Sequence, residues 1–470
     1  MLHISLLIMV LGFTLNTDSP NDTQPLQEEP HHDTTIPTNE IWYTTIRDIG
    51  AITPHNVNAF DANIVSNHYD EEQGHWVISF DSDVTMVGER AFWFCGNLTS
   101  VTLPDSVTTI GDSAFSNCSD IATLRLGCSL MTIESHAFQY CRNLTSITIP
   151  DGVISIGEDT FSGCSSLSEF KGQFASNDGR CLVIDNTIIA YAEGSGSEYT
   201  IPQGITQIGQ SAFEDCTSLV SVTLPNSVIT IAQDAFNSCS NLKSVTLGSS
   251  LRSIEDRAFA YCNALESIRL PYTLKDIGES SFYECSNLKS VVIPDSVTKI
   301  KDSAFADCGL TSVTIGRGVT TIGGRAFDGS SGRLTIYSKA IAEHNHSDEN
   351  YPTTKYEGWL YGWLYGTQFN TLIIGKGIER IGDYLFCGCS RLTSVTLPSS
   401  ISAIGTAAFY ECYNLTGIYC KAETPPSCGD KIIYTDGSTY DIYVPIEAVE
   451  AYKGAPQWSS YVASIKGYSF

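Results

Sequence analysis

Residues 231–299 read IAQDAFNSCSNLKSVTLGSSLRS, IEDRAFAYCNALESIRLPYTLKD and IGESSFYECSNLKSVVIPDSVTK, three consecutive copies of one 23-residue pattern. Each copy starts with isoleucine, continues through an A-F-x-x-C or S-F-x-x-C group to a leucine, and then alternates apolar with polar residues. A single copy would expose half of its apolar side chains, so only stacking on its neighbours buries them. The period therefore predicts a solenoid in which each copy is one coil.

The same pattern extends over most of the chain, and its cysteines mark the phase. They recur at 23-residue intervals within three series, and each is preceded by a phenylalanine three positions earlier. A further copy near Val319 keeps Ile322, Gly323, Ala326 and Phe327 but lacks the cysteine, so we count twelve coils. The cysteines in phase are Cys95, Cys118, Cys141, Cys164, Cys216, Cys239, Cys262, Cys285, Cys308, Cys389 and Cys412.

A short strand is expected in every coil. Stretches such as Val222-Thr223-Leu224 alternate with period two, which indicates a strand with two residues inward and one outward. Proline follows in several coils, as Pro225 does here, and ends the strand because it cannot donate to a ladder. The sequence thus predicts a repeat solenoid of mainly short parallel β-strands with turns and short helical segments, in about twelve 23-residue coils.

The 16 cysteines could indicate a disulfide framework, but their even spacing favours buried thiols. Equivalent positions in stacked coils have parallel Cα–Cβ vectors, whereas a disulfide needs convergent ones. We expect the five cysteines from Cys216 to Cys308 to be reduced, buried and inert. Serine at these positions should cost about 1 to 3 kcal/mol, and alanine less if no hydrogen bond is lost. Off the series, a bridge between Cys420 and Cys428 stays open.

The outward residue of each strand is the first candidate for contact with a partner. The row is mostly short and uncharged, and two arginines interrupt it. It suits broad contact with protein or glycan, although threonine also favours exposed strands for structural reasons alone. The row consists of Thr102, Arg125, Thr148, Thr223, Thr246, Arg269, Val292, Thr314, Thr335, Thr396 and Tyr419.

A second candidate lies in the insertion at residues 338–371, where Trp359, Tyr361, Trp363 and Tyr365 alternate with leucine and glycine. On an exposed strand these rings would form an aromatic strip suited to sugar or protein contact. Packed over the edge of the solenoid they would be local core, which the usual burial of aromatic residues favours. Both interpretations stay open.

Charge and hydropathy limit the partners. The formal net charge of -26 repels phosphate backbones and anionic headgroups, so we expect neither nucleic acid nor a bare membrane surface as partner. The apolar run Ile4–Leu15 has the length of a signal peptide rather than of a transmembrane helix, which indicates export to the cell surface or medium. No later run is long enough for a membrane span, and we expect a monomer.

The expected organisation follows from where the repeats begin and stop. A hairpin is expected within the first insertion, because Cys181–Ile184 and Thr187–Ala190 flank the turn residues Asp185-Asn186. The segments are a signal peptide (1–16), a disordered acidic and threonine-rich tether (17–38), a lead-in cap (39–83), coils (84–170), a β-hairpin insertion (171–204), coils (205–337), an aromatic-rich insertion (338–371), coils (372–420) and a C-terminal cap (421–470).

The repeat and its flanks resemble those of the BspA-type leucine-rich-repeat surface proteins. The resemblance is carried by the A-F-x-x-C-x-x-L-x-x-V-x-L-P-x-S-V-x-x-I-G pattern and by three other stretches, and it covers roughly residues 39–470. These are NEIWYTT with DANIVSNHYD before the repeats, the insertion FASNDGRCLVIDNTIIAYAEGSGSEYTIPQGIT at residues 174–206, and IYVPIEAVEAYKGAPQW after the repeats. It implies adhesion to host matrix proteins, epithelium or other microbes. The chain departs from the bacterial lipoprotein form because its first cysteine is Cys95.

No sequence motif for catalysis stands at a credible position: there is no nucleophile elbow, phosphate-binding glycine loop, zinc-protease helix or dinucleotide fingerprint. His344, His346, Asp348 and Glu349 lack a spaced metal motif. We therefore expect no catalytic residue, cofactor or metal. The leading hypothesis is a non-enzymatic adhesin that binds a host matrix or surface protein or a glycan. The alternatives are a glycan-binding module for nutrient capture, dependent on Trp359 and Trp363, and a hydrolase.

Overall fold

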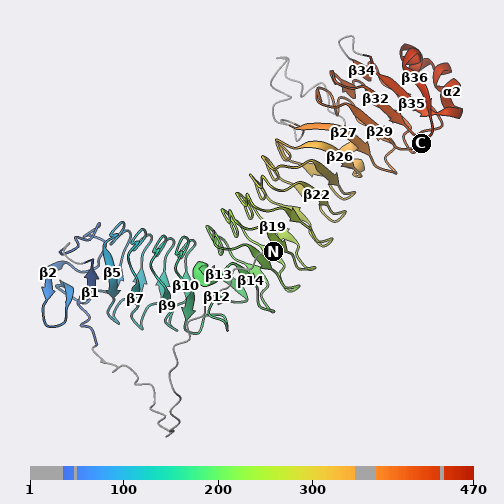
Figure 1. The fold of residues 1–470 in the computed structure, drawn as a ribbon. Helices are drawn as coiled ribbons and strands as arrows, with labels where there is room; N and C mark the ends of the chain where they lie inside the picture. The colour runs from blue at the N-terminus through green and yellow to red at the C-terminus, as the bar shows by residue number, and fades with distance from the viewer. Residues whose placement is uncertain (1–34, 47–49, 345–363, 365–366, 435–438) are drawn as a thin grey trace, which may run out of the picture. The chain divides into compact units, whose positions relative to one another are not determined.

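The structure is a computed structural model that describes residues 35–46, 50–344, 364, 367–434 and 439–470. Each coil runs along the stack's two sides as two short strands, and a turn that carries the A-F-x-x-C group joins the second strand to the first strand of the next coil (Figure 1). The coils stack in parallel, which confirms the predicted repeat solenoid.

The first strands of the coils form what we call the outward face. Twelve of its strands follow the turns recognised in the sequence, and four more, β14, β27, β35 and β36, do not. The stack has about 16 turns rather than the predicted twelve, because these four lack the A-F-x-x-C signature. The strands are β5 (Leu98–Thr102), β7 (Thr123–Arg125), β9 (Ser146–Thr148), β11 (Glu169–Lys171), β14 (Glu198–Thr200), β16 (Ser221–Thr223), β18 (Ser244–Thr246), β20 (Ser267–Ile268), β22 (Ser290–Ile293), β24 (Ser312–Ile315), β26 (Ser331–Ile336), β27 (Gln368–Ile374), β29 (Ser394–Leu397), β32 (Gly417–Cys420), β35 (Asp441–Pro445) and β36 (Ile465–Tyr468).

The second strands form the opposite face and are mostly two residues long. Most end in a buried or half-buried isoleucine that pairs in register with the next, as Ile208, Ile231 and Ile254 do, whereas the first ends in Val87 and the last in Cys428. The strands are β4 (Met86–Val87), β6 (Thr109–Ile110), β8 (Thr132–Ile133), β10 (Ser155–Ile156), β15 (Gln207–Ile208), β17 (Thr230–Ile231), β19 (Ser253–Ile254), β21 (Asp276–Ile277), β23 (Lys299–Ile300), β25 (Thr321–Ile322), β28 (Arg380–Ile381), β30 (Ala403–Ile404) and β33 (Ser427–Cys428).

The turns form a third ladder. In the coil of His136, three backbone N–H groups donate to carbonyl groups of the next turn at 2.9 to 3.0 Å. The pairs are His136 with Glu158, Phe138 with Thr160, and Tyr140 with Ser162. Two residues of each such turn have positive φ, here His136 at 56° and Tyr140 at 58°. The left-handed residues turn alternate N–H groups toward the next coil, so the turns stack like strands.

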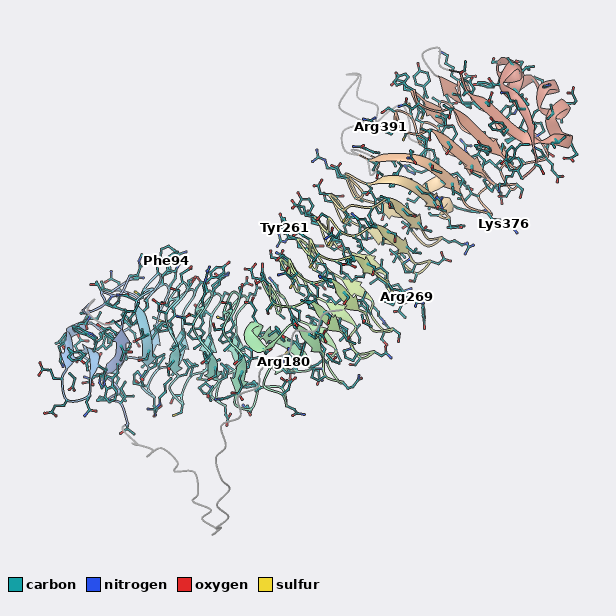
Figure 2. The ribbon with its side chains drawn as sticks, viewed as in Figure 1. Phe94, Arg180, Tyr261, Arg269, Lys376 and Arg391 are labelled. Atoms are coloured by element: carbon teal, nitrogen blue, oxygen red, sulfur yellow. The ribbon has the colours of Figure 1, made fainter. Side chains whose placement is uncertain are left out.

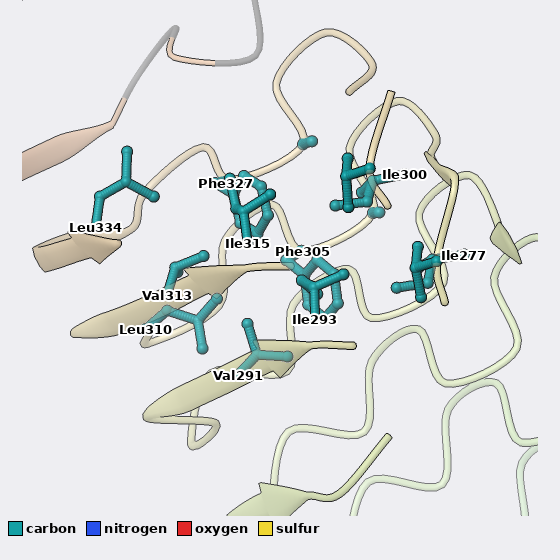
Figure 3. Close-up of a cluster of buried hydrophobic side chains, with 14 of the residues drawn as sticks. Ile277, Val291, Ile293, Ile300, Phe305, Leu310, Val313, Ile315, Phe327 and Leu334 are labelled. Carbon is teal, nitrogen blue, oxygen red and sulfur yellow. The ribbon is translucent and has the colours of Figure 1, made fainter. Parts of the chain in front are cut away.

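Phenylalanine stacking fills the interior beneath these turns. Phe236, Phe259 and Phe282 are fully buried, and their rings stack at centroid distances of 5.1 and 5.3 Å. Figure 3 shows Phe305 and Phe327 continuing this row beside the isoleucine and valine side chains of both faces. The core is therefore a set of like-on-like columns, as the period predicts.

The N-terminal cap is antiparallel. β2 (Ile64–Asp70) pairs with β3 (His75–Phe80), β3 with β1 (Glu40–Thr45), and β1 with the first strand of the outward face. Ile36 is buried and the carbonyl of Thr38 accepts from the backbone of Val84 at 2.9 Å. Residues 36–38, which the sequence analysis assigned to the tether over 17–38, therefore contact the cap, because the apolar side chain of Ile36 packs on its core. Residues 1–34 lie outside the described residues.

The first insertion rebuilds one coil by different means. β12 (Cys181–Ile184) and β13 (Thr187–Tyr191) pair antiparallel across Asp185 and Asn186, whose φ values of 48° and 60° give a tight turn of the hairpin type. β13 then continues the second face by pairing with β15, and a 3₁₀ turn, η1 (Glu193–Ser195), leads into β14. The insertion thus keeps the stack continuous without an A-F-x-x-C turn.

The C-terminal cap covers the last coil. Two short strands, β31 (Phe409–Tyr410) and β34 (Ile433–Tyr434), pair on its turn side. The short helix α1 (Lys339–Ala342) is not part of this cap and lies at the start of the second insertion, residues 338–371. After β35 come η3 (Ile446–Ala448), α2 (Val449–Gly454) and η4 (Pro456–Ser464), which bury Trp458 and Tyr461. The chain then returns to the outward face as β36, a strand that the sequence analysis did not anticipate.

The cysteine series forms a hydrogen-bonded ladder. The Sγ of Cys262 donates to the carbonyl of Phe236 at 3.2 Å, 26 residues earlier, and seven other cysteines of the series do the same at 3.0 to 3.3 Å. All 16 cysteines are free, including Cys420 and Cys428, and those from Cys216 to Cys308 are buried as predicted. Cys420 Sγ instead lies 3.3 Å from the hydroxyl of Tyr452.

The ladder predicts a sharp division of thiol reactivity. Burial raises the pKa of Cys164 to about 12 and that of Cys95 to about 11, whereas Cys128 is exposed. Because the thiolate is the reactive form, we expect one fast-reacting thiol in native protein, removed by Cys128→Ser, and all 16 after denaturation without reductant. Ellman titration checks this. A denatured count near zero would show that the chain is cross-linked.

The hydrogen bond also corrects the expected order of cysteine replacements. That order assumed that the side chain had no hydrogen bond, but the Phe236 carbonyl gives a Cys262→Ser hydroxyl an acceptor. We therefore expect Cys262→Ser to cost no more than Cys262→Ala, which loses the bond and leaves a cavity, and both to cost about 1 to 2 kcal/mol. Urea unfolding of the two variants measures the order; a serine variant clearly less stable than the alanine variant would contradict it.

Candidate functional site: the outward face

The outward residues of the strands lie as the alternation predicts. In β16 Val222 and the following Leu224 are buried and Thr223 is exposed, and Thr223 pairs in register with Thr246 of β18. The neighbouring strands place their middle residues side by side in the same way. A regular row of side chains therefore follows the stack, and it is separate from the turn side. Figure 2 shows Arg269 on the side of the stack opposite Tyr261, which belongs to a turn.

Both arginines of the row are exposed. Arg125 ends β7 and Arg269 follows β20, and within the described parts of the chain neither contacts a carboxylate in an ion pair. By contrast Arg257, on the turn side, holds Asp234 through two bonds of 2.7 and 2.8 Å. Arg125 and Arg269 thus present unneutralised guanidinium groups on a chain whose net charge is -26.

Two members of the row differ from expectation. Thr335 was predicted to face outward and exposed, but only 9% of it is exposed, because its strand places it between Thr314 and the large side chain of Ile373. Val292 is apolar yet 63% exposed. Sequence reasoning also missed Lys171, the outward residue of β11, and the outward residues of the four strands without a recognised period, which are Thr200, Ile373, Tyr443 and Lys466.

An aromatic cluster, which we call the terminal cluster, closes this face. The ring of Tyr419 stacks on Tyr443 at 4.7 Å, and Tyr468 meets both edge to face at 5.5 and 5.6 Å. The rings of Phe470 and Tyr468 pack with their centroids 5.0 Å apart. The Lys421 ammonium lies over the Phe470 ring, 5.5 Å from its centroid. Tyr468 and Phe470 are 43% and 48% exposed. Only the pairing of β32, β35 and β36 brings these residues together.

Charged groups border the terminal cluster. Asp441 accepts from Lys466 at 2.7 Å and from the Tyr443 hydroxyl at 3.1 Å. The Lys466 hydrogen bond lowers the pKa of Asp441, and the Asp441 hydrogen bond raises the pKa of both Lys466 and Tyr443. The cluster therefore combines exposed ring faces and edges with fixed donors and one acceptor, which is the chemistry that recognises a polyol or a mixed polar and apolar surface.

The other predicted contact residues, Trp359, Tyr361, Trp363 and Tyr365, lie outside the described residues. Their exposure therefore stays a prediction.

Across the described ranges, no three histidine, cysteine, aspartate or glutamate side chains gather where they could ligate a metal ion. In the same ranges, none of the helices has the length and apolarity that crossing a bilayer requires.

Comparison with known proteins gives a family model and several solved structures that are similar to this chain. The model of the BspA type leucine rich repeat region matches it in six copies, over residues 63–178, 206–334 and 362–445. No curated protein matches it. Among solved structures it is similar to a leucine rich cell surface protein from Faecalibacterium prausnitzii, with 34% identity over 48% of this chain and a TM-score of 0.42; the chain spans only 62% of that protein.

It is also similar to a leucine-rich repeat protein from Bacteroides ovatus, with 20% identity over 92% of this chain and all of that one and a TM-score of 0.46. Because the repeat model matches more than half of the sequence, the chain belongs to the BspA-type leucine-rich-repeat family.

Proposed function

We propose that this protein is a non-enzymatic binding scaffold that contacts its partner through the outward face. The observation that carries the proposal is the regular exposed row in which Arg125 and Arg269 project without an ion-pair partner among the described residues. Arginine is over-represented among residues that dominate binding energy, and flanking threonines offer hydroxyl groups with little entropy to lose. The partner is a host matrix or surface protein or a glycan.

The proposed setting is the cell surface or the surrounding medium, reached through the apolar run Ile4–Leu15. Adhesion to host or microbial surfaces follows from that setting and from a face formed by many turns. A broad face made of repeats gives many weak contacts rather than one deep pocket, which suits extended ligands. Free thiols do not oppose export, because the ladder cysteines are buried and cannot converge on one another.

The test is binding of the purified protein to arrays of host matrix proteins and glycans. The double variant Arg125→Ala with Arg269→Ala should weaken binding to the selected ligand by roughly tenfold or more. Arg252→Ala is the matched control, since this arginine is exposed but lies before a strand of the opposite face. Binding to no class of ligand would remove the proposal, and equal losses in control and double variant would place the contact elsewhere.

A glycan ligand is the second candidate, and the terminal cluster favours it. Aromatic rings that are about half exposed and bordered by Lys421, Lys466 and Asp441 match the apolar face and hydroxyl rim of a sugar. Such a site would serve nutrient capture as well as adhesion. Replacing Tyr468 and Phe470 with alanine should abolish glycan binding, whereas loss on replacing Trp359 and Trp363 instead would assign the site to the second insertion.

A further inference from the structure

The turn ladder breaks where the first insertion enters the stack. Before the break, each turn donates three N–H groups to the next. Among the described residues the corresponding groups of Asp159, Phe161 and Gly163 have no such partner, because the inserted coil has no A-F-x-x-C turn. It supplies one bond of the ladder, from Tyr191 N–H to the Ala212 carbonyl at 2.9 Å. A small cavity remains in the wall of the solenoid between the turns of residues 157–163 and 209–216.

Carboxyl groups meet across this cavity. Asp159 lines one side and Glu214 the other, so the two carboxyl groups face each other across a small space. The Glu214 Oε1 accepts from Asn237 at 3.2 Å. A bond between two carboxyl groups requires that one of them carry the proton. In the same wall the Oγ of Ser162, a residue that is 8% exposed, and the Oδ1 of Asp159 are buried and have no hydrogen-bond partner among the described residues.

The residues around the cavity are mostly acidic. Glu193 lines the cavity and accepts from Thr217 at 3.0 Å. Asp215 lies between two lining residues, Glu214 and Cys216, and accepts from the Tyr140 hydroxyl at 3.2 Å. The remaining charged groups that face it are partly paired. They are His136, 3.5 Å from Asp159 and 3.4 Å from Asp112; Glu158, bound by Gln210; and Asp234, held by Arg257.

We propose that Asp159 and Glu214 share one proton across this cavity and so make the break in the ladder a pH-sensitive joint. With the proton in place, the two turns are joined by the carboxyl–carboxyl bond in place of the missing ladder bonds. Without it, two carboxylates face each other beside Glu193 and Asp215, and their repulsion opens the joint. The turns on the two sides of this break are held to their other neighbours by backbone bonds, so opening is confined to the joint.

Burial supports this direction, because it raises the pKa of Glu214 to about 8, with further contributions from Asp159. The folded joint therefore holds a proton that the open joint releases. Stability of the closed joint is complete below the usual glutamic acid pKa, declines as pH rises above it, and is lost once pH has passed about 8. The joint is closed in acid and opens in mild alkali.

Hydrogen–deuterium exchange of the full chain between pH 5 and 9 tests the proposal. After correction for intrinsic exchange rates, opening of residues 189–194 and 209–216 should rise by roughly tenfold per pH unit up to about pH 8, because one proton is released. Amides of a central coil, residues 277–285, should show no such rise. A flat profile at the break in the wild-type protein overturns the proposal.

In the variant Glu214→Gln the side chain keeps its shape and an N–H donor for Asp159, but it cannot ionise. The corrected hydrogen–deuterium exchange of this variant at the break should therefore be independent of pH. Asp159→Asn removes the opposing carboxyl group but leaves Glu214 buried, so the rise should end at a lower pH than in the wild-type protein. This variant gives a second route if the first does not fold. Glu266→Gln, at an exposed glutamate, is the control and should keep the wild-type slope. A slope that persists unchanged in both joint variants assigns the proton to another group and overturns the proposal.

Discussion

Replacing Phe259 with alanine is expected to destabilise the protein by about 3 to 5 kcal/mol. The side chain is fully buried and stacks on Phe236 and Phe282 at 5.1 and 5.3 Å, so truncation removes contacts with the coils on both sides. The columns leave the neighbours no direction in which to collapse, because each ring is fixed by the next. Chemical unfolding followed by circular dichroism gives the change in free energy.

Tyr272→Ala provides the control. This tyrosine lies in the next turn of the same coil and is 78% exposed, so its removal should change stability by less than about 0.5 kcal/mol. In a stack whose stability is the sum of coil and interface contributions, the Phe259 variant should also broaden the unfolding transition as the two sides uncouple. A loss below about 1 kcal/mol would mean that the phenylalanine column does not hold the coils together.

Removing Arg180 should have the next largest effect, about 2 to 4 kcal/mol, because it joins the hairpin to the coil that follows. The guanidinium donates to Ser195 Oγ at 2.8 Å and to the Glu198 carbonyl at 3.0 Å, and it lies 4.5 Å from the centroid of the Tyr199 ring. Its substitution by alanine leaves these acceptors and the ring face without their partner. Thermal unfolding of Arg180→Ala measures the loss.

Arg180→Lys separates charge from geometry. Lysine keeps the cation but lacks the planar fork that makes both hydrogen bonds while stacking on the ring, so we expect it to recover less than half of the loss. Arg252→Ala, which removes an exposed arginine, should leave stability within about 0.5 kcal/mol of the wild-type protein. Equal stability of Arg180→Ala and wild type would show that the insertion is held by its backbone pairing alone.

The terminal cluster could not be predicted from the sequence. Tyr419 was placed in the outward row from its period, but Tyr443, Tyr468 and Phe470 belong to no repeat. Their meeting depends on β35 and β36 pairing onto the last coil, a choice made by the cap as it folds over Trp458. Residues without a period have no register that a sequence can supply, so their neighbours follow from tertiary packing.

By itself the sequence determined the solenoid, its family and the inward columns, because a side chain repeated every 23 residues can be buried only by stacking on its own copies. It also determined that the cysteines from Cys216 to Cys308 would be buried. The tertiary structure alone decided how the gaps are closed: the four strands outside the period, the sulfur hydrogen bonds, Arg180 and the Asp159–Glu214 joint. These contacts join residues that share no repeat position, and their partners are set by the shape of the preceding coil rather than by a local pattern.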